Sequence, residues 1–182
     1  MEDGGVLSVM KHFPGHGSTT ADSHLELPVI NKSLQELKQY DFAPFQQYID
    51  AGLGGCLTAH LYIPAIDKRR VPGTMSKAYV TNLLQKKMHF NGLIFTDALG
   101  MEGAKEVKGS VCVNAFLAGN DILLMPNEVG PEIAAIKQAI AAGKIKQKDV
   151  DARVKKILRF KYALGLDTKP QIDLANIVAD IN

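Results

Sequence analysis

The sequence has little excess charge and no long apolar segment. Its 182 residues include 21 Lys and Arg against 19 Asp and Glu, which gives a formal net charge of +2. So small an imbalance offers no electrostatic reason to expect binding to nucleic acid or to an anionic membrane. No apolar run approaches the roughly 18 residues that a membrane-spanning helix requires. We therefore expect neither a nucleic-acid partner nor a membrane span.

Cysteine is also scarce. Cys56 and Cys112 both lie in apolar surroundings and form no Cys-x-x-Cys pair. Two cysteines do not make a disulfide framework, and they do not identify the cellular compartment. Each is most simply interpreted as a small buried apolar residue.

What the sequence does contain is an alternation of short apolar segments with amphipathic ones. Such alternation is typical of parallel strands joined by right-handed helical crossovers, and it predicts an α/β fold. The near-continuous apolar character of the strands predicts that both faces of the sheet are covered. The expected strands are residues 6–11, 54–60, 92–97 and 121–125, and the expected helices lie within residues 33–52, 76–90, 110–118, 131–143 and 150–164.

Three of the expected strands end on side chains that are able to do chemistry. In α/β folds the active site lies at the carboxyl ends of the strands, where this sequence places Lys11, His12, His60 and Asp97. Asp97 is either a catalytic carboxylate or an N-cap of the segment that follows. Lys11 either keeps such a carboxylate ionised and donates to hydroxyls, or forms a structural ion pair. His60 is either part of the binding site or a packing residue behind it.

The long loop of residues 12–28 holds three of the five histidines. Asp22 and His24 are two residues apart, so in an extended segment their side chains point to the same side. An Asp–His pair orients an imidazole and raises its basicity, although this spacing also arises by coincidence on protein surfaces. Metal binding by Asp22, His12, His16 and His24 is a further alternative, but their spacing fits no standard zinc site. We therefore expect no metal.

Together these segments resemble a known enzyme family. Residues 11–17 (KHFPGHG), followed by Asp22-Ser23-His24, are similar to the signature of glycoside hydrolase family 3, in particular of its β-N-acetylglucosaminidase branch. Further similar segments follow in the expected order: LTAH at 57–60, TDALGM at 96–101, AGNDILLMP at 118–126 and VDARVKKILRFKYALGL at 150–166. The resemblance extends from about residue 6 to residue 166. It implies the (β/α)8 barrel fold of that family.

The resemblance also implies a role for each matched residue. Asp97 matches the nucleophile that forms a covalent glycosyl-enzyme. His24 matches the acid/base, with Asp22 as its partner, at a place where most retaining glycosidases use a second carboxylate. The implied reaction is hydrolysis of terminal N-acetyl-β-glucosaminides, such as peptidoglycan-derived sugars, without a cofactor. The residues that we expect to bind the sugar are Lys11, His12 and, as a further candidate, His60.

The length of the chain predicts that only part of this barrel is present. A complete barrel takes about 250 residues, and the matched segments correspond to its second half. We therefore expect about four β/α units over residues 1–166 and an exit tail or linker over residues 167–182. The missing first half, which supplies further sugar-binding groups in the family, is the expected partner. Open sheet edges would also favour self-association.

Several alternatives stay open at this point. The chain departs from the family pattern at Ser18, where an acidic residue is common, and at Ala98, where a second aspartate is common; neither change affects the matched catalytic positions. A β-glucosidase of the same family is one alternative, and an inactive half-barrel or assembly module is another. A histidine base adds no negative charge that would repel phosphate. Phosphate could then replace water as the acceptor of the sugar, so phosphorolysis is a side hypothesis. For the cellular location, the resemblance suggests only a bacterial cytoplasm or periplasm.

Overall fold

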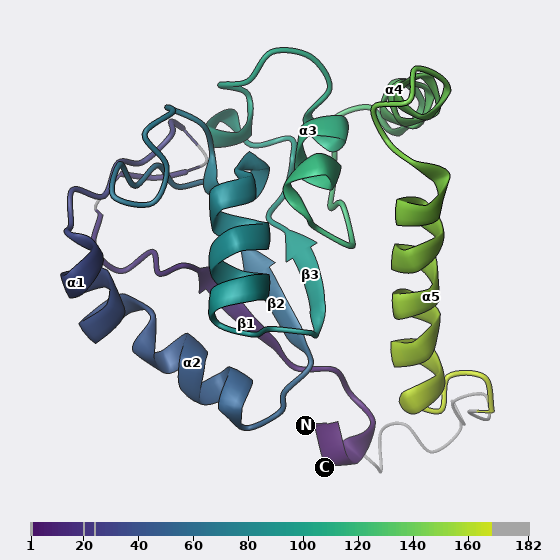
Figure 1. Ribbon diagram of the computed structural model, residues 1–182, viewed down its shortest axis with the longest axis horizontal. Helices are drawn as coiled ribbons and strands as arrows, with labels where there is room; N and C mark the ends of the chain where they lie inside the picture. Colours follow the sequence, from purple (N-terminus) through teal and green to yellow (C-terminus); the bar gives the residue numbers. More distant parts are fainter. Residues whose placement is uncertain (1, 20, 24, 169–182) are drawn as a thin grey trace, which may run out of the picture.

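A computed structural model describes residues 2–19, 21–23 and 25–168, and its centre is a small parallel sheet (Figure 1). Strand β2 pairs with β3 in continuous register, from Gly55 opposite Leu93 to Thr58 opposite Thr96. The pairing of β1 with β2 changes register towards the carboxyl end of β1. The strands, in spatial order, are β1 (Val9–Phe13), β2 (Gly55–Thr58) and β3 (Leu93–Thr96). The parallel α/β arrangement is thus confirmed.

The fourth expected strand, residues 121–125, does not form as a strand. This segment runs parallel to β3 and is joined to it by a single bridge between Phe95 and Ile122. Beyond that bridge, the hydroxyl of Thr96 accepts the Leu124 N–H at 2.8 Å, in the place where a ladder would use a backbone carbonyl. The side chain thus interrupts the regular hydrogen-bond pattern, although the segment keeps the position of a fourth strand.

The helices lie close to the predicted ranges. Ser33 forms a capping box with Glu36, and Ser110 Oγ accepts the Val113 N–H at 3.0 Å. The helical region expected within residues 33–52 is interrupted at Phe42, and Pro44 lies in the first turn of the helix that follows, where its missing N–H leaves no bond unmade. The helical segments are η1 (Glu2–Gly4), α1 (Leu34–Glu36), η2 (Leu37–Asp41), α2 (Ala43–Asp50), η3 (Gly73–Met75), η4 (Ala78–Lys87), η5 (Glu102–Ala104), α3 (Val111–Ala118), α4 (Val129–Ala141) and α5 (Gln147–Ala163). None of these helices is long and apolar enough to cross a membrane.

The main hydrophobic core lies between the sheet and the helices α2 and η4. Cys56 and Ile94 from the sheet pack there with Phe45 of α2 and Leu84 of η4. Strands β2 and β3 are covered as the sequence predicted, but β1 is not, because burial alternates along it from exposed Val9 to buried Phe13. The alternation follows from the position of β1 at the edge of the sheet.

Helix α5 stands at the side of the molecule, and polar contacts tie it to the rest (Figure 1). Arg153 donates to the carbonyl oxygens of Asn120 at 2.8 Å and Phe116 at 2.9 Å, and its guanidinium lies 3.9 Å from the centre of the Phe116 ring. Lys156 pairs with Asp121 at 2.7 Å. These bonds attach α5 to the end of α3 and to the segment beside β3.

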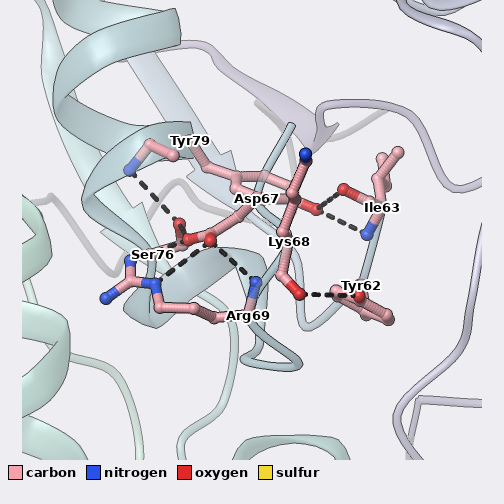
Figure 2. Close-up of polar contacts among 8 residues, drawn as sticks. Tyr62, Ile63, Asp67, Lys68, Arg69, Ser76 and Tyr79 are labelled. Atoms are coloured by element: carbon pink, nitrogen blue, oxygen red, sulfur yellow. Dashed lines mark hydrogen bonds and ion pairs between the residues drawn. The ribbon is translucent and has the colours of Figure 1, made fainter. Parts of the chain in front are cut away.

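A buried polar cluster holds the connection between β2 and η4 (Figure 2). Asp67 Oδ2 accepts from the Ser76 hydroxyl at 2.6 Å and from the Arg69 guanidinium at 2.8 Å. The Tyr79 hydroxyl accepts the Ile63 N–H at 2.6 Å. Burial raises the pKa of Asp67, but the hydrogen bonds from Arg69 and Ser76 outweigh it and leave that pKa below its usual value. The cluster thereby fixes the chain that leads away from the carboxyl end of β2.

Candidate functional site

Asp97 lies at the carboxyl edge of the sheet, immediately after β3. Its N–H donates to the Thr58 carbonyl at 2.9 Å, which holds it beside the end of β2. Its Oδ1 accepts the Ala98 N–H at 2.9 Å, and its Oδ2 faces the Nε2 of His12 at 3.9 Å. The next helical turn, η5, has Met101 at its N-cap, so Asp97 does not cap it. With 18% of its side chain exposed, the carboxylate is open to a ligand.

Lys11 and His12 lie in the middle of β1, whereas the sequence placed them at the end of a strand. The imidazole of His12 is partly exposed and approaches Asp97 from across the edge of the sheet, and its ring lies edge-on to that of His16 with 6.1 Å between centroids. Lys11 is exposed. Across the part of the chain that the structure describes, no ion pair joins Lys11 to Asp97.

The expected catalytic loop begins beside these histidines. His16 Nε2 lies 3.4 Å from the hydroxyl of buried Ser23, and the carbonyl of Asp22 accepts the N–H groups of Leu25 and Glu26. His16 connects this turn to β1, because its ring also meets that of His12. His24 lies outside the described residues, so its pairing with Asp22 stays a prediction. Residues 2–19, 21–23 and 25–168 contain no cluster of three or more potential His, Cys, Asp or Glu metal ligands.

His60 is placed behind the site rather than in it. Its side chain has no exposed surface, and its Nε2 lies 3.0 Å from the Ala98 carbonyl oxygen. Because a carbonyl only accepts, Nε2 carries the proton, and the buried Nδ1 has no hydrogen-bond partner. Burial lowers the pKa of His60, which keeps the ring neutral. The structure therefore favours the packing alternative for His60 over contact with a sugar.

One contact near the site was not predicted from the sequence. The N–H of Gly103, in η5, donates to the carbonyl of Ser23 at 3.2 Å. Gly103 looks like an ordinary loop glycine in the sequence, and no local signal indicates that two segments so far apart in the chain touch. The contact places the turn after Asp97 against the loop that contains Asp22.

Comparisons with known proteins point to one family. Residues 1–160 match the family described as "Glycosyl hydrolase family 3 N terminal domain". A curated protein named Beta-hexosaminidase A, from Pseudoalteromonas piscicida, is 34% identical over 90% of this chain and 31% of its own length. A Beta-hexosaminidase from Chromobacterium violaceum is 38% identical over 73% of this chain and 38% of its own length. The chain thus spans about a third of these relatives.

A solved structure agrees with this relationship. It is described as a glycoside hydrolase family 3 beta-N-acetylglucosaminidase from Paenibacillus sp. str. FPU-7, and it superposes with a TM-score of 0.90 at 30% identity. The superposition covers 95% of this chain and 34% of that one. The α/β arrangement around Asp97 therefore matches part of a larger known fold.

Proposed function

Because the chain belongs to glycoside hydrolase family 3, we propose that it carries the catalytic residues of a retaining β-N-acetylglucosaminidase. Asp97 supports this proposal most directly, since it is a partly exposed carboxylate at the carboxyl edge of a parallel sheet, with a histidine beside it. The relatives named beta-hexosaminidase favour an N-acetylhexosaminide as the substrate. The alternative within the family is a β-glucosidase.

In the first proposed step Asp97 is the nucleophile. Its Oδ1 is occupied by the Ala98 N–H, so Oδ2 is the oxygen left to attack the anomeric carbon. A bond forms between Oδ2 and that carbon, while the bond from the carbon to the leaving oxygen breaks. His24, protonated and oriented by Asp22, donates its proton to the leaving oxygen. The product of this step is a glycosyl-aspartate.

In the second proposed step water releases the sugar. The imidazole of His24, now neutral, accepts a proton from water as the water oxygen bonds to the anomeric carbon. The ester bond to Asp97 breaks and the carboxylate is regenerated. A histidine suits both steps because its reference pKa, near 6.5, allows either protonation state at neutral pH. His12 and Lys11, at the same edge of the sheet, are the proposed donors to sugar hydroxyls.

We further propose that the described strands form the second half of an eight-stranded barrel. The exposed face of β1 supports this, since an edge strand with one uncovered face is what half of a barrel would present. The proposed catalytic and sugar-binding residues then form only part of a subsite, so the 182-residue chain alone is expected to be impaired, because efficient catalysis requires a complete set of positioned groups. An inactive assembly module, joined through the open edge of the sheet, is the competing proposal.

The test uses protein expressed from its complete reading frame, with nitrophenyl N-acetyl-β-glucosaminide and nitrophenyl β-glucoside as substrates. Asp97→Ala is expected to lower kcat by about a thousandfold or more, as the loss of a nucleophile does. The control Asp151→Asn, on the exposed side of α5, should leave kcat unchanged. A fluorinated N-acetylglucosaminyl fluoride should trap the intermediate, and peptide mass spectrometry should place the label on Asp97.

Four results would count against this proposal. Hydrolysis that survives Asp97→Ala, or a label on another residue, would remove Asp97 from its role. Preference for the glucoside would favour the β-glucosidase alternative. Faster turnover with added phosphate, together with a glycosyl phosphate as product, would replace hydrolysis with phosphorolysis.

A further inference from the structure

Gly103 makes an unusually close approach to the loop that contains Asp22 and Ser23. A Cβ atom built on Gly103 would lie 2.9 Å from the carbonyl oxygens of both Ser23 and Glu26, and 3.2 Å from the Cβ of His60. The two oxygens belong to the backbone, so they cannot give way unless the loop itself moves. A glycine is required at this position because the backbones approach closely.

His60 lies next to Gly103, and hydrogen bonds through Ala98 connect it to Asp97. The Nε2–H of His60 donates to the Ala98 carbonyl at 3.0 Å, and the Ala98 N–H donates to Asp97 Oδ1 at 2.9 Å. Ala98 is therefore bonded on both sides, to the buried imidazole and to the carboxylate. Since His60 has no exposed surface, its imidazole end of this chain of bonds is shielded from competing water, whereas the Asp97 end is partly exposed.

We propose that Gly103 and His60 act together as a platform that sets the position of the Asp22–Ser23 loop relative to Asp97. Both are positioning residues, because both are buried. The inference rests on the proposed function, in which Ser23 stands in the sequence between the two members of the acid/base pair. A retaining glycosidase needs its nucleophile and its acid/base close together at the bond that is cleaved. The platform supplies a direct structural link between the two.

Changes on the two sides of the platform are expected to have different effects. Gly103→Ala pushes the Ser23 and Glu26 carbonyls away and displaces the acid/base loop, while the His60–Ala98–Asp97 bonds stay in place. His60→Leu removes the donor to Ala98 and loosens the nucleophile instead. His60→Gln retains an N–H donor at a similar distance along the side chain, so it should keep much of the catalytic activity that His60→Leu loses.

The dependence on the leaving group distinguishes these effects. A dinitrophenyl leaving group departs without a proton, whereas a methyl glycoside needs general acid catalysis, which contributes about 10²–10⁴-fold. In the complete protein, Gly103→Ala is expected to lower kcat/KM for the methyl glycoside by about a hundredfold, and for the dinitrophenyl glycoside by only about threefold. His60→Leu should lower both by a similar factor. General damage to the fold would not depend on the leaving group.

Amide hydrogen exchange tests the contact between Gly103 and the Asp22–Ser23 loop without any substrate. In the wild-type protein the Gly103 amide should exchange slowly, and residues 19–26 should be protected. Gly103→Ala should lose the protection of residues 19–26. Gly130→Ala is the matched control, since a Cβ on Gly130 would meet nothing within 4 Å, and it should change neither exchange nor kinetics. The test does not need Gly103→Ala if that variant does not fold. The exchange rate of the wild-type Gly103 amide then tests the contact with the loop, and the activities of His60→Gln and His60→Leu test the role of His60.

The proposal is overturned by rapid exchange of the wild-type Gly103 amide, by unchanged protection in folded Gly103→Ala, or by a loss of activity in Gly103→Ala that is equal for both leaving groups. A complete protein without hexosaminidase activity would refute the proposed function. In that case the exchange measurements, which need no activity, would still support or overturn the docking of the loop on the platform.

Discussion

The imidazole Nε2 of His12 lies 3.9 Å from Oδ2 of Asp97, although the two residues come from strands that are not neighbours in the sheet. His12 belongs to β1 and Asp97 follows β3, with β2 between them. The carboxylate and the imidazole meet across the carboxyl edge of the sheet, where both are partly exposed. A ligand bound at this edge would be within reach of both side chains.

His12→Asn is therefore expected to weaken catalysis without unfolding the protein. Loss of a hydrogen bond that involves a charged group costs about 1.5–3 kcal/mol, which corresponds to a loss of about 10- to 100-fold in kcat/KM for an N-acetyl-β-glucosaminide. Steady-state kinetics on the complete protein measure this loss. His89→Asn is the control, since His89 is exposed and has φ of 59°, which asparagine tolerates. Equal activity in the two variants would exclude His12 from the site.

Lys156→Met is expected to destabilise the fold because it removes the cation that is paired directly with the buried Asp121 carboxylate. The Asp121 side chain is 5% exposed, and beyond Lys156 it also accepts the Ile94 N–H at 2.9 Å. Breaking a buried pair from one side costs about 3–5 kcal/mol, and because Lys156 is partly exposed we expect a smaller loss of about 2–3 kcal/mol. Urea unfolding measures it. Lys155→Met, on the exposed side of the same helix, should change stability by less than about 0.5 kcal/mol.

The Asp67 cluster should make stability depend on pH in a defined direction. Because the pKa of Asp67 is lowered in the folded state, the carboxylate contributes stability above the pKa of the unfolded chain, about 3.9. That contribution is lost as the pH falls through the folded pKa. Asp67→Asn should cost about 1–3 kcal/mol near neutral pH, and the difference from wild type should shrink in acid.

Urea unfolding of wild type and Asp67→Asn at several pH values between about 7 and 3 provides the measurement. The control Asp151→Asn removes an exposed carboxylate of α5 that accepts from Gln147. A difference between wild type and Asp67→Asn that stays constant down to the lowest pH would show that the Asp67 carboxylate is not stabilised by folding.

Neither cysteine of the chain should react with thiol reagents while the protein is folded. Burial raises the pKa of Cys56, and burial together with the nearby Glu132 raises the pKa of Cys112 to about 12. The thiolate is the reactive form, so at about pH 8 both side chains are almost entirely unreactive thiols. Iodoacetamide followed by peptide mass spectrometry should label Cys56 and Cys112 in urea and neither in buffer. Rapid labelling in buffer would mean that one of the two sites opens.

The sequence by itself determined the alternation of strands and helices and the order of the family motifs. Ser33 and Ser110 begin their helices as predicted, because a cap is a local hydrogen bond between residues three positions apart. The position of Asp97 after a buried strand could also be predicted from the sequence, since it depends on a short apolar run. Such features follow from nearest neighbours along the chain.

Only the tertiary structure decided which residues touch across the sheet. It showed that residues 121–125 stop short of a regular strand because the Thr96 hydroxyl takes the place of a ladder acceptor. It placed His60 behind Asp97, and it brought Gly103 against Ser23. These contacts join segments that are far apart in the sequence, and their geometry depends on how closely the backbones pack, which no local pattern of residue types encodes.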